Sequence, residues 1–170
     1  DKYQLPAIII SDLLISDETS TIEPELLDMQ PLIDRGELIT EAGDEAGNYE
    51  RYKFTESGIS PRALPGIPGY EHVVATDEHM PDGVLISDEF THPHKRRAML
   101  EKRQRKMDGL LADLPPPAIV GAPAADVTLI GWGSTAGVIL EAIEQLAALG
   151  VVANHLHFKW LVPFHADEAD

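Results

Sequence analysis

The chain has 170 residues, a formal net charge of −16 and no cysteine. Its apolar fraction of 44% is that of a soluble globular protein, and no apolar run reaches the roughly 18 residues that a membrane-spanning helix needs. The missing cysteines exclude disulfides and cysteine-ligated iron–sulfur clusters on this chain, and the acidic charge argues against nucleic acid or an anionic membrane as a partner. The sequence opens without an export signal, so we expect a cytoplasmic location.

The first predicted element is a strand at residues 5–10, Leu-Pro-Ala-Ile-Ile-Ile. A short apolar run rich in β-branched residues is typical of a strand buried on both faces of a parallel sheet. Such a strand needs neighbours, so we expect it to belong to a sheet that extends beyond this chain. Residues 13–50 mix acidic residues, Pro and Gly without periodicity and are predicted to be mainly surface connection.

Residues 51–70 contain three prolines and three glycines, which predicts an ordered loop. Residues 71–94 hold four of the seven histidines among acidic residues. These residue types could bind a metal ion, but their spacing fits no zinc or di-iron template, so a solvated acidic loop is favoured. The residues concerned are His72, Asp77, Glu78, His79, Asp88, His92 and His94.

A basic helix is predicted at residues 94–111, because this stretch consists of good helix formers and has no Pro or Gly before Gly109. Its centre, residues 95–106, carries seven of the 13 basic residues, opposed only by Glu101. Such a helix on an acidic body favours internal docking or a subunit contact over an anion site. Along one face it places Met99, Arg103 and Met107, beside Leu100 and Leu111.

Three successive prolines at 115–117 end this helix, and residues 114–125 are predicted to be a linker. A strand at 126–133, a helix at 135–149 with Ser134 as N-cap and Gly150 as stop, and a strand at 151–158 then predict one right-handed βαβ unit. Two strands are too few for a stable parallel sheet, so we expect this domain also to be incomplete.

The turn at residues 131–137 matches the Gly-x-Gly-x-x-Gly/Ala pattern of dinucleotide-binding folds. The following strand ends in Asn-His-Leu-His at 154–157 and offers no acidic residue for a ribose. A tight structural turn is therefore favoured over nicotinamide or flavin binding, with anion binding at the helix N-terminus left open. The chain has no Walker phosphate loop and no Gly-x-Ser-x-Gly elbow.

Three separated stretches carry a family resemblance. The residues at 5–12, the loop Arg-Tyr-Lys-Phe-Thr-Glu-Ser-Gly-Ile-Ser-Pro-Arg at 51–62, and Met99 with Lys102, Arg103 and Lys106 resemble the latter part of the alpha subunit of 2-oxoacid:ferredoxin oxidoreductases. The Gly-Trp-Gly-Ser-Thr turn at 131–135 resembles the opening of that subunit's transketolase C-terminal-like domain.

The resemblance implies an α/β fold made of parallel-sheet fragments. Residues 1–113 would be the C-terminal part of a pyrimidine-binding-type domain of a thiamine enzyme, with the long ordered loop and the basic helix. The linker at 114–125 would follow, and residues 126–170 would begin the transketolase C-terminal-like domain.

The implied activity is oxidative decarboxylation of a 2-oxoacid of the 2-oxoglutarate or pyruvate type to an acyl-coenzyme A, with electrons passed to ferredoxin. Thiamine diphosphate, Mg²⁺ and an iron–sulfur cluster are implied cofactors, held mainly by partner chains, of which the beta subunit is the first. The family's Tyr-Pro-Ile-Thr-Pro motif is absent here, so no catalytic residue is assigned and the isolated chain is predicted to be inactive.

By analogy, four residues of the loop are expected to shape the 2-oxoacid end of the site: Glu56, Ser57, Ser60 and Arg62. The alternative is that Arg62 and its neighbours only brace a domain contact. Two other functions stay open, a non-catalytic assembly module of the same family and a subunit of another thiamine-diphosphate enzyme. The loop and the basic helix speak against the second of these.

Overall fold

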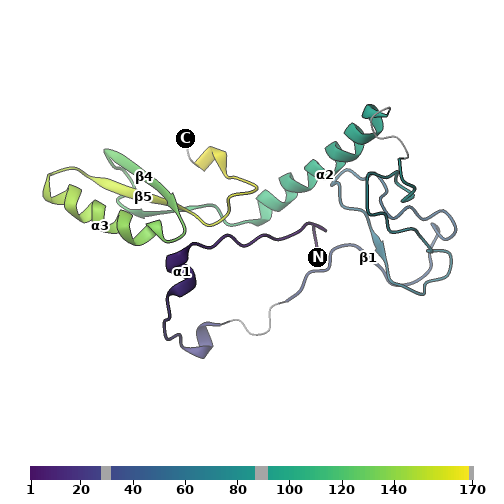
Figure 1. The fold of residues 1–170 in the computed structure, drawn as a ribbon, viewed down its shortest axis with the longest axis horizontal. Helices are drawn as coiled ribbons and strands as arrows, with labels where there is room; N and C mark the ends of the chain where they lie inside the picture. Colours follow the sequence, from purple (N-terminus) through teal and green to yellow (C-terminus); the bar gives the residue numbers. More distant parts are fainter. Residues whose placement is uncertain (28–31, 87–91, 169–170) are drawn as a thin grey trace. The chain divides into compact units, whose positions relative to one another are not determined.

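The computed structural model describes residues 1–27, 32–86 and 92–168, and the chain divides into two compact units (Figure 1). The first unit takes in residues 1–6 and 30–110, and the second takes in residues 7–29 and 111–170. Each unit is described by itself below.

The strand predicted at residues 5–10 is not formed. The segment is extended but unpaired, and Ile8 and Ile9 are 84% and 93% exposed. A strand is stabilised by backbone hydrogen bonds to a neighbour, and none of the strands among the described residues pairs with this segment. The apolar run, whose composition predicted burial, is therefore exposed to solvent among the described residues.

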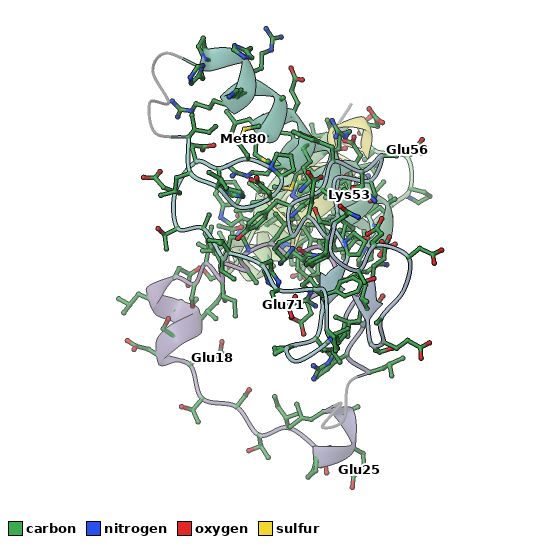
Figure 2. The ribbon with its side chains drawn as sticks, turned by 90° about the vertical axis from the view of Figure 1, so that its right-hand side faces the viewer. Glu18, Glu25, Lys53, Glu56, Glu71 and Met80 are labelled. Atoms are coloured by element: carbon green, nitrogen blue, oxygen red, sulfur yellow. The ribbon has the colours of Figure 1, made fainter. Side chains whose placement is uncertain are left out.

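Short helices follow in the predicted surface connection. They are α1, Leu13–Asp17, and the 3₁₀ turn η1, Pro24–Leu26, and neither contains a buried residue. The acidic side chains of Glu18 and Glu25, next to and within these turns, are exposed (Figure 2).

The first unit contains little regular structure besides one helix. Two short strands, β1 (Leu38–Ile39) and β2 (Arg62–Ala63), pair in parallel with Leu38 opposite Arg62. Tyrosines hold the surrounding loops, as predicted for an ordered loop. The ring of Tyr49 lies 5.1 Å from that of the buried Tyr70, and the Tyr49 hydroxyl donates to the Pro61 carbonyl at 2.9 Å.

The predicted basic helix is confirmed as α2, Pro93–Asp113. The buried residues are Met99, Lys102 and Lys106, while Leu100 is 41% exposed. The helix therefore turns a largely cationic face toward the loops of the first unit. None of the helices in the described part of the chain is long and apolar enough to cross a membrane.

The histidine-rich stretch before α2 is not uniformly solvated as predicted. His79 is 7% exposed, its ring lies 3.9 Å from the ring of Tyr52, and its Nδ1 contacts the Asp77 carbonyl at 2.7 Å. The described residues contain no group of three or more side chains able to hold a metal ion. Asp88 lies outside the described residues.

The second unit contains the predicted βαβ motif. Strand β4 (Val127–Trp132), helix α3 (Thr135–Ala148) and strand β5 (Ala153–Phe158) follow in order, and β4 and β5 pair in parallel over their full length. The α/β class is thus confirmed. The turn after α3 has Gly150 at φ +80°, the left-handed conformation expected of a helix-stopping glycine.

A third strand lies on the other edge of β5. Residues of β3, Ala118–Gly121, pair with it antiparallel, so the sheet order is β3-β5-β4. This strand falls within the range predicted to be a linker. The central strand β5 supplies most of the buried residues of this unit, namely Ala153, Asn154, His155, Leu156 and Phe158. The turn η2, Ala166–Glu168, lies near the end of the described residues.

Candidate functional site

A cluster of buried cations forms where α2 packs on the loop at residues 51–62. Lys102 is 4% exposed, and its Nζ donates to the Tyr52 carbonyl at 2.8 Å and to Ser60 Oγ at 2.6 Å. Lys106, one turn further along α2, is 9% exposed. Neither lysine takes part in the ion pairs formed among the described residues.

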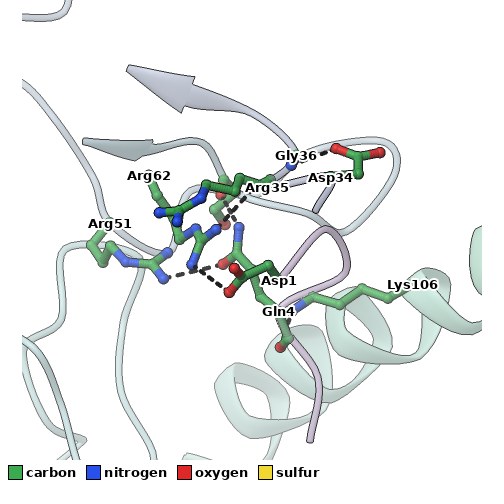
Figure 3. Close-up of polar contacts among 9 residues, drawn as sticks. Asp1, Gln4, Asp34, Arg35, Gly36, Arg51, Arg62 and Lys106 are labelled. Atoms are coloured by element: carbon green, nitrogen blue, oxygen red, sulfur yellow. Dashed lines mark hydrogen bonds and ion pairs between the residues drawn. The ribbon is translucent and has the colours of Figure 1, made fainter. Parts of the chain in front are cut away.

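Gln4 connects the members of this cluster (Figure 3). Its side-chain amide donates to the Ser60 carbonyl at 2.6 Å, its Oε1 accepts from Arg51 Nη2 at 3.1 Å, and its own carbonyl accepts from Lys106 Nζ at 3.4 Å. Gln4 has φ +51°, a left-handed conformation that costs free energy in a residue with a side chain. Strained residues of this kind concentrate at ligand sites.

Arg51 has an unused donor in the same place. Its Nη1 is buried and has no hydrogen-bond partner among the described residues, while its Nη2 is held by Gln4. A buried donor without an acceptor is costly. The arrangement therefore offers a fixed N–H for an acceptor from outside the described residues.

The cluster brings several like charges together. The pKa of Lys102 is lowered to about 8, chiefly by burial and then by repulsion from Lys106 and Arg51. Burial first, and then Arg51 and Arg103, lower the pKa of Lys106. Like charges held together out of water are destabilising, and a bound anion would relieve that repulsion.

The structure places only one of the four predicted site residues inside this cluster. Ser60 is 2% exposed and contacts Lys102, whereas Glu56 and Ser57 are exposed. The carbonyl of Glu56 accepts from Arg105 Nε at 3.2 Å, and Ser57 Oγ accepts from the Ile59 amide at 3.2 Å. Figure 2 marks Glu56 at the rim of the unit.

Arg62, the fourth predicted residue, follows the loop as part of β2. It donates from Nη2 to the Arg35 carbonyl at 2.8 Å, and Nη1 lies 3.6 Å from an Asp1 carboxylate oxygen (Figure 3). Its Nε is buried and has no hydrogen-bond partner in the part of the chain that the structure describes. These contacts fit the alternative role of bracing the loop. Because Nε is unpaired, the predicted role of Arg62 in contacting a ligand stays a prediction.

Sequence analysis assigned no site role to Arg51, Gln4, Lys102 or Lys106. Two signals pointed to Lys102 and Lys106: they are four apart on one helix face, and both are among the residues that carry the family resemblance. Gln4 and Arg51 come together only through the fold, since 47 positions separate them.

Comparison with known proteins identifies the class of chain to which this site belongs. No family profile matches the chain. It is 34% identical over 149 residues to the alpha subunit of 2-oxoacid:ferredoxin oxidoreductase 1 from Sulfurisphaera tokodaii, covering 85% of this chain and 22% of that protein. It is 32% identical over 169 residues to the 2-oxoglutarate oxidoreductase subunit KorA of Mycobacterium tuberculosis, covering 98% and 24% respectively.

A solved structure agrees with these relatives. The 2-oxoglutarate:ferredoxin oxidoreductase from Magnetococcus marinus, with 2-oxoglutarate, coenzyme A and succinyl-CoA bound, is 34% identical with a TM-score of 0.62. The match covers 76% of this chain and 22% of that one. Fold and sequence thus agree on an α/β chain that is similar to one part of these alpha subunits.

This chain is homologous to one segment of the 2-oxoacid:ferredoxin oxidoreductase alpha subunits, as the resemblance of its motifs implied. It spans less than a quarter of the length of either curated relative.

Proposed function

We propose that this chain forms part of the alpha subunit of an enzyme that oxidatively decarboxylates a 2-oxoacid. The carboxylate leaves as carbon dioxide, the acyl group passes to coenzyme A, and two electrons pass to ferredoxin. The observation that carries the proposal is the cluster of Arg51, Lys102 and Lys106 near Ser60, whose concentrated positive charge suits an anion. The homology supplies the chemical class of that anion.

In this proposal the loop at residues 51–62 receives the charged end of the 2-oxoacid. The free N–H of Arg51 is a donor suited to a carboxylate, because the guanidinium fork matches the two oxygens in geometry and charge. Lys102 and Lys106 add positive potential from α2. Glu56, Ser57, Ser60 and Arg62 remain the predicted side chains that shape the pocket around it.

The cofactors of the proposed enzyme would be thiamine diphosphate, Mg²⁺ and an iron–sulfur cluster. The residues of this chain do not fit the cluster, since the sequence has no cysteine, and the described residues contain no group of three or more metal-ligating side chains. We place all three mainly on partner chains. The partners proposed are the beta subunit, with ferredoxin and coenzyme A engaged through the complex, in the cytoplasm.

The competing function is a non-catalytic assembly module that keeps only the family's docking surfaces. Such a module has no need of buried cations without a counter-charge, because replacing them with apolar residues would be neutral or stabilising. The presence of this cluster therefore favours the enzyme.

The test is turnover by the complete alpha subunit containing this segment, co-purified with its beta subunit. We expect coenzyme A-dependent reduction of ferredoxin with pyruvate, 2-oxoglutarate or a related 2-oxoacid, and no turnover by the 170-residue chain alone. A complex loaded with thiamine diphosphate, Mg²⁺ and iron–sulfur cluster that reduces ferredoxin with none of these acids would refute the proposal.

A further inference from the structure

A pocket of about 440 Å³ lies in the second unit, lined by helix α3, strands β3 and β5, and the proline segment before β3. Helix α3 packs on β4 and β5 and not on β3. One helix is about 10 Å wide and strands lie about 4.8 Å apart, so a single helix covers about two strands. The hollow beside α3 follows from this geometry. Its size suits a small organic ligand.

Two histidines on β5 line this pocket as a hydrogen-bonded pair. His155 is 1% exposed, and its Nε2 lies 3.1 Å from His157 Nδ1. His155 Nδ1 lies 2.9 Å from the Leu129 carbonyl, which can only accept, so this nitrogen carries a proton. In the neutral ring His155 Nε2 is then the acceptor, and His157 Nδ1 donates to it. This leaves a lone pair on His157 Nε2.

The polar groups of the pocket are neutral imidazoles. Burial first, and then His155 and Lys159, lower the pKa of His157, which favours its neutral ring at pH 7. A third lining histidine, His165, has a buried Nε2 without a hydrogen-bond partner among the residues that the structure describes. A buried polar atom without a partner is costly, and a ligand with polar edges would remove that cost.

The solvent side of the pocket carries a cation and an indole. Lys159 and Trp160 both line the pocket and are both exposed. Lys159 takes part in none of the ion pairs formed among the described residues. An ammonium beside an apolar surface attracts a negatively charged group, and an indole face stacks on flat rings.

We propose that this pocket binds a small planar nitrogen heterocycle that carries an acid group. The ring lies against Leu140 and Trp160, and its N–H donates to His157 Nε2. The acid group pairs with Lys159, and His165 Nε2 meets a second polar atom of the ligand. This site does not rest on the proposed function, because it is defined by binding and not by turnover.

The test measures binding of kynurenate to the complete alpha–beta complex by isothermal titration calorimetry at pH 7. Kynurenate is a flat bicyclic acid with a ring N–H. Two analogues each lack one feature: 4-quinolone has no carboxylate, and 2-naphthoate has no ring N–H. We expect kynurenate to bind about tenfold more tightly than either analogue, because each analogue loses one hydrogen bond or one charge pair.

Four variants locate the bound ligand. Leu140→Trp should fill the pocket and raise the Kd of kynurenate about tenfold or more. Val138→Trp is its matched control and should bind as wild type, because Val138 is 70% exposed on the same helix and does not line the pocket. His157→Phe should weaken kynurenate and leave 2-naphthoate unchanged. Lys159→Gln should weaken both acids and leave 4-quinolone unchanged.

Three results would overturn the proposal. The first is that kynurenate does not bind the complex at millimolar concentrations, as when another part of the alpha subunit or the beta subunit covers the pocket. The second is that Leu140→Trp binds kynurenate as wild type does, because the ligand then lies elsewhere. The third is that 2-naphthoate binds as tightly as kynurenate, since the pocket is then only apolar. If His157→Phe does not assemble, Leu140→Trp and the two analogues decide.

Discussion

The carboxylate of Asp12 accepts a hydrogen bond from the backbone amide of Ser134 at 3.1 Å, although 122 positions separate the two residues. Its other oxygen accepts from the Ile15 amide at 2.9 Å and so caps α1. A Cβ on Gly133, the residue before Ser134, would lie 3.2 Å from the same carboxylate. The glycine turn before α3 thus already faces a carboxylate of this chain, which agrees with the structural interpretation of its Gly-x-Gly pattern.

Asp12→Ala should therefore remove the hydrogen bonds that the Asp12 carboxylate accepts from the Ile15 and Ser134 amides. The pKa of Asp12 is lowered by the hydrogen bond from the Ile15 amide first, and then by those from Ser134. A lowered pKa in the folded state means that the stabilisation is present above pH 3.8 and is lost as the pH falls through the lowered value. We expect faster hydrogen exchange at the Ile15 and Ser134 amides in the variant at pH 7.

The matched control for this change is Asp17→Ala, at the end of the same helix. It should leave the exchange of the Ser134 amide as in wild type. If the Ser134 amide exchanges no faster in Asp12→Ala than in Asp17→Ala, the hydrogen bond between Asp12 and Ser134 does not protect that amide in solution.

Gly131→Ala should destabilise the second unit, because Gly131 sits where α3 packs closely on β4. An added Cβ would lie 2.5 Å from Ile139 Cδ1 and 2.7 Å from Thr135 Oγ1, whose hydroxyl donates to the Trp132 carbonyl. Overpacking of this kind costs about 1–3 kcal/mol of unfolding free energy, measurable by urea denaturation.

The control is Gly137→Ala within α3, where a Cβ would meet nothing within 4 Å. That variant should be as stable as wild type or more stable by about 0.5–1 kcal/mol, because alanine loses less backbone entropy in a helix. Equal effects from the two substitutions would show that the close packing at Gly131 is absent.

Gly58→Ala should release the loop from α2. Gly66 provides the comparison, since both glycines have positive φ but a Cβ on Gly66 would meet nothing within 4 Å. Both alanine variants bear the left-handed strain of about 1–2 kcal/mol, and only Gly58→Ala also clashes with the Lys102 backbone. We expect Gly58→Ala to lower the free energy of unfolding more than Gly66→Ala does. Only Gly58→Ala should show faster hydrogen exchange at residues 53–60.

The parts of the fold that the sequence predicted are those with local periodicity. The βαβ unit from β4 to β5 follows from a strand-like run, a helical pattern and a stopping glycine, each contained within a few residues. Helix α2 followed in the same way. Strand β3 was missed because Pro115–Pro117 marked its surroundings as a linker, while the short run Ile119–Val120 within it carried the strand signal.

The parts that the sequence did not predict depend on partners far along the chain. The run at residues 5–10 has the composition of a buried strand, but composition cannot provide the neighbour that a strand requires. The sequence did not predict which face of α2 is buried. Met99 is covered together with Lys102 and Lys106, and the Lys102 ammonium donates to the Tyr52 carbonyl and the Ser60 hydroxyl.

The candidate site shows the same division. Its loop was located through the family motif, and Ser60 was included among the predicted residues. Arg51 was quoted as part of that motif but received no role, because the unpaired Nη1 that marks it exists only in the folded chain.

The most direct measurement is the KM of the complete alpha–beta complex for its 2-oxoacid after Arg51→Lys, compared with Arg97→Lys on the exposed face of α2. Lysine keeps the charge but loses the fork of donors, so we predict a KM raised about tenfold or more with a smaller effect on kcat, and no change for Arg97→Lys. If the KM of the Arg51→Lys complex equals that of wild type, the buried cation cluster does not bind the substrate carboxylate.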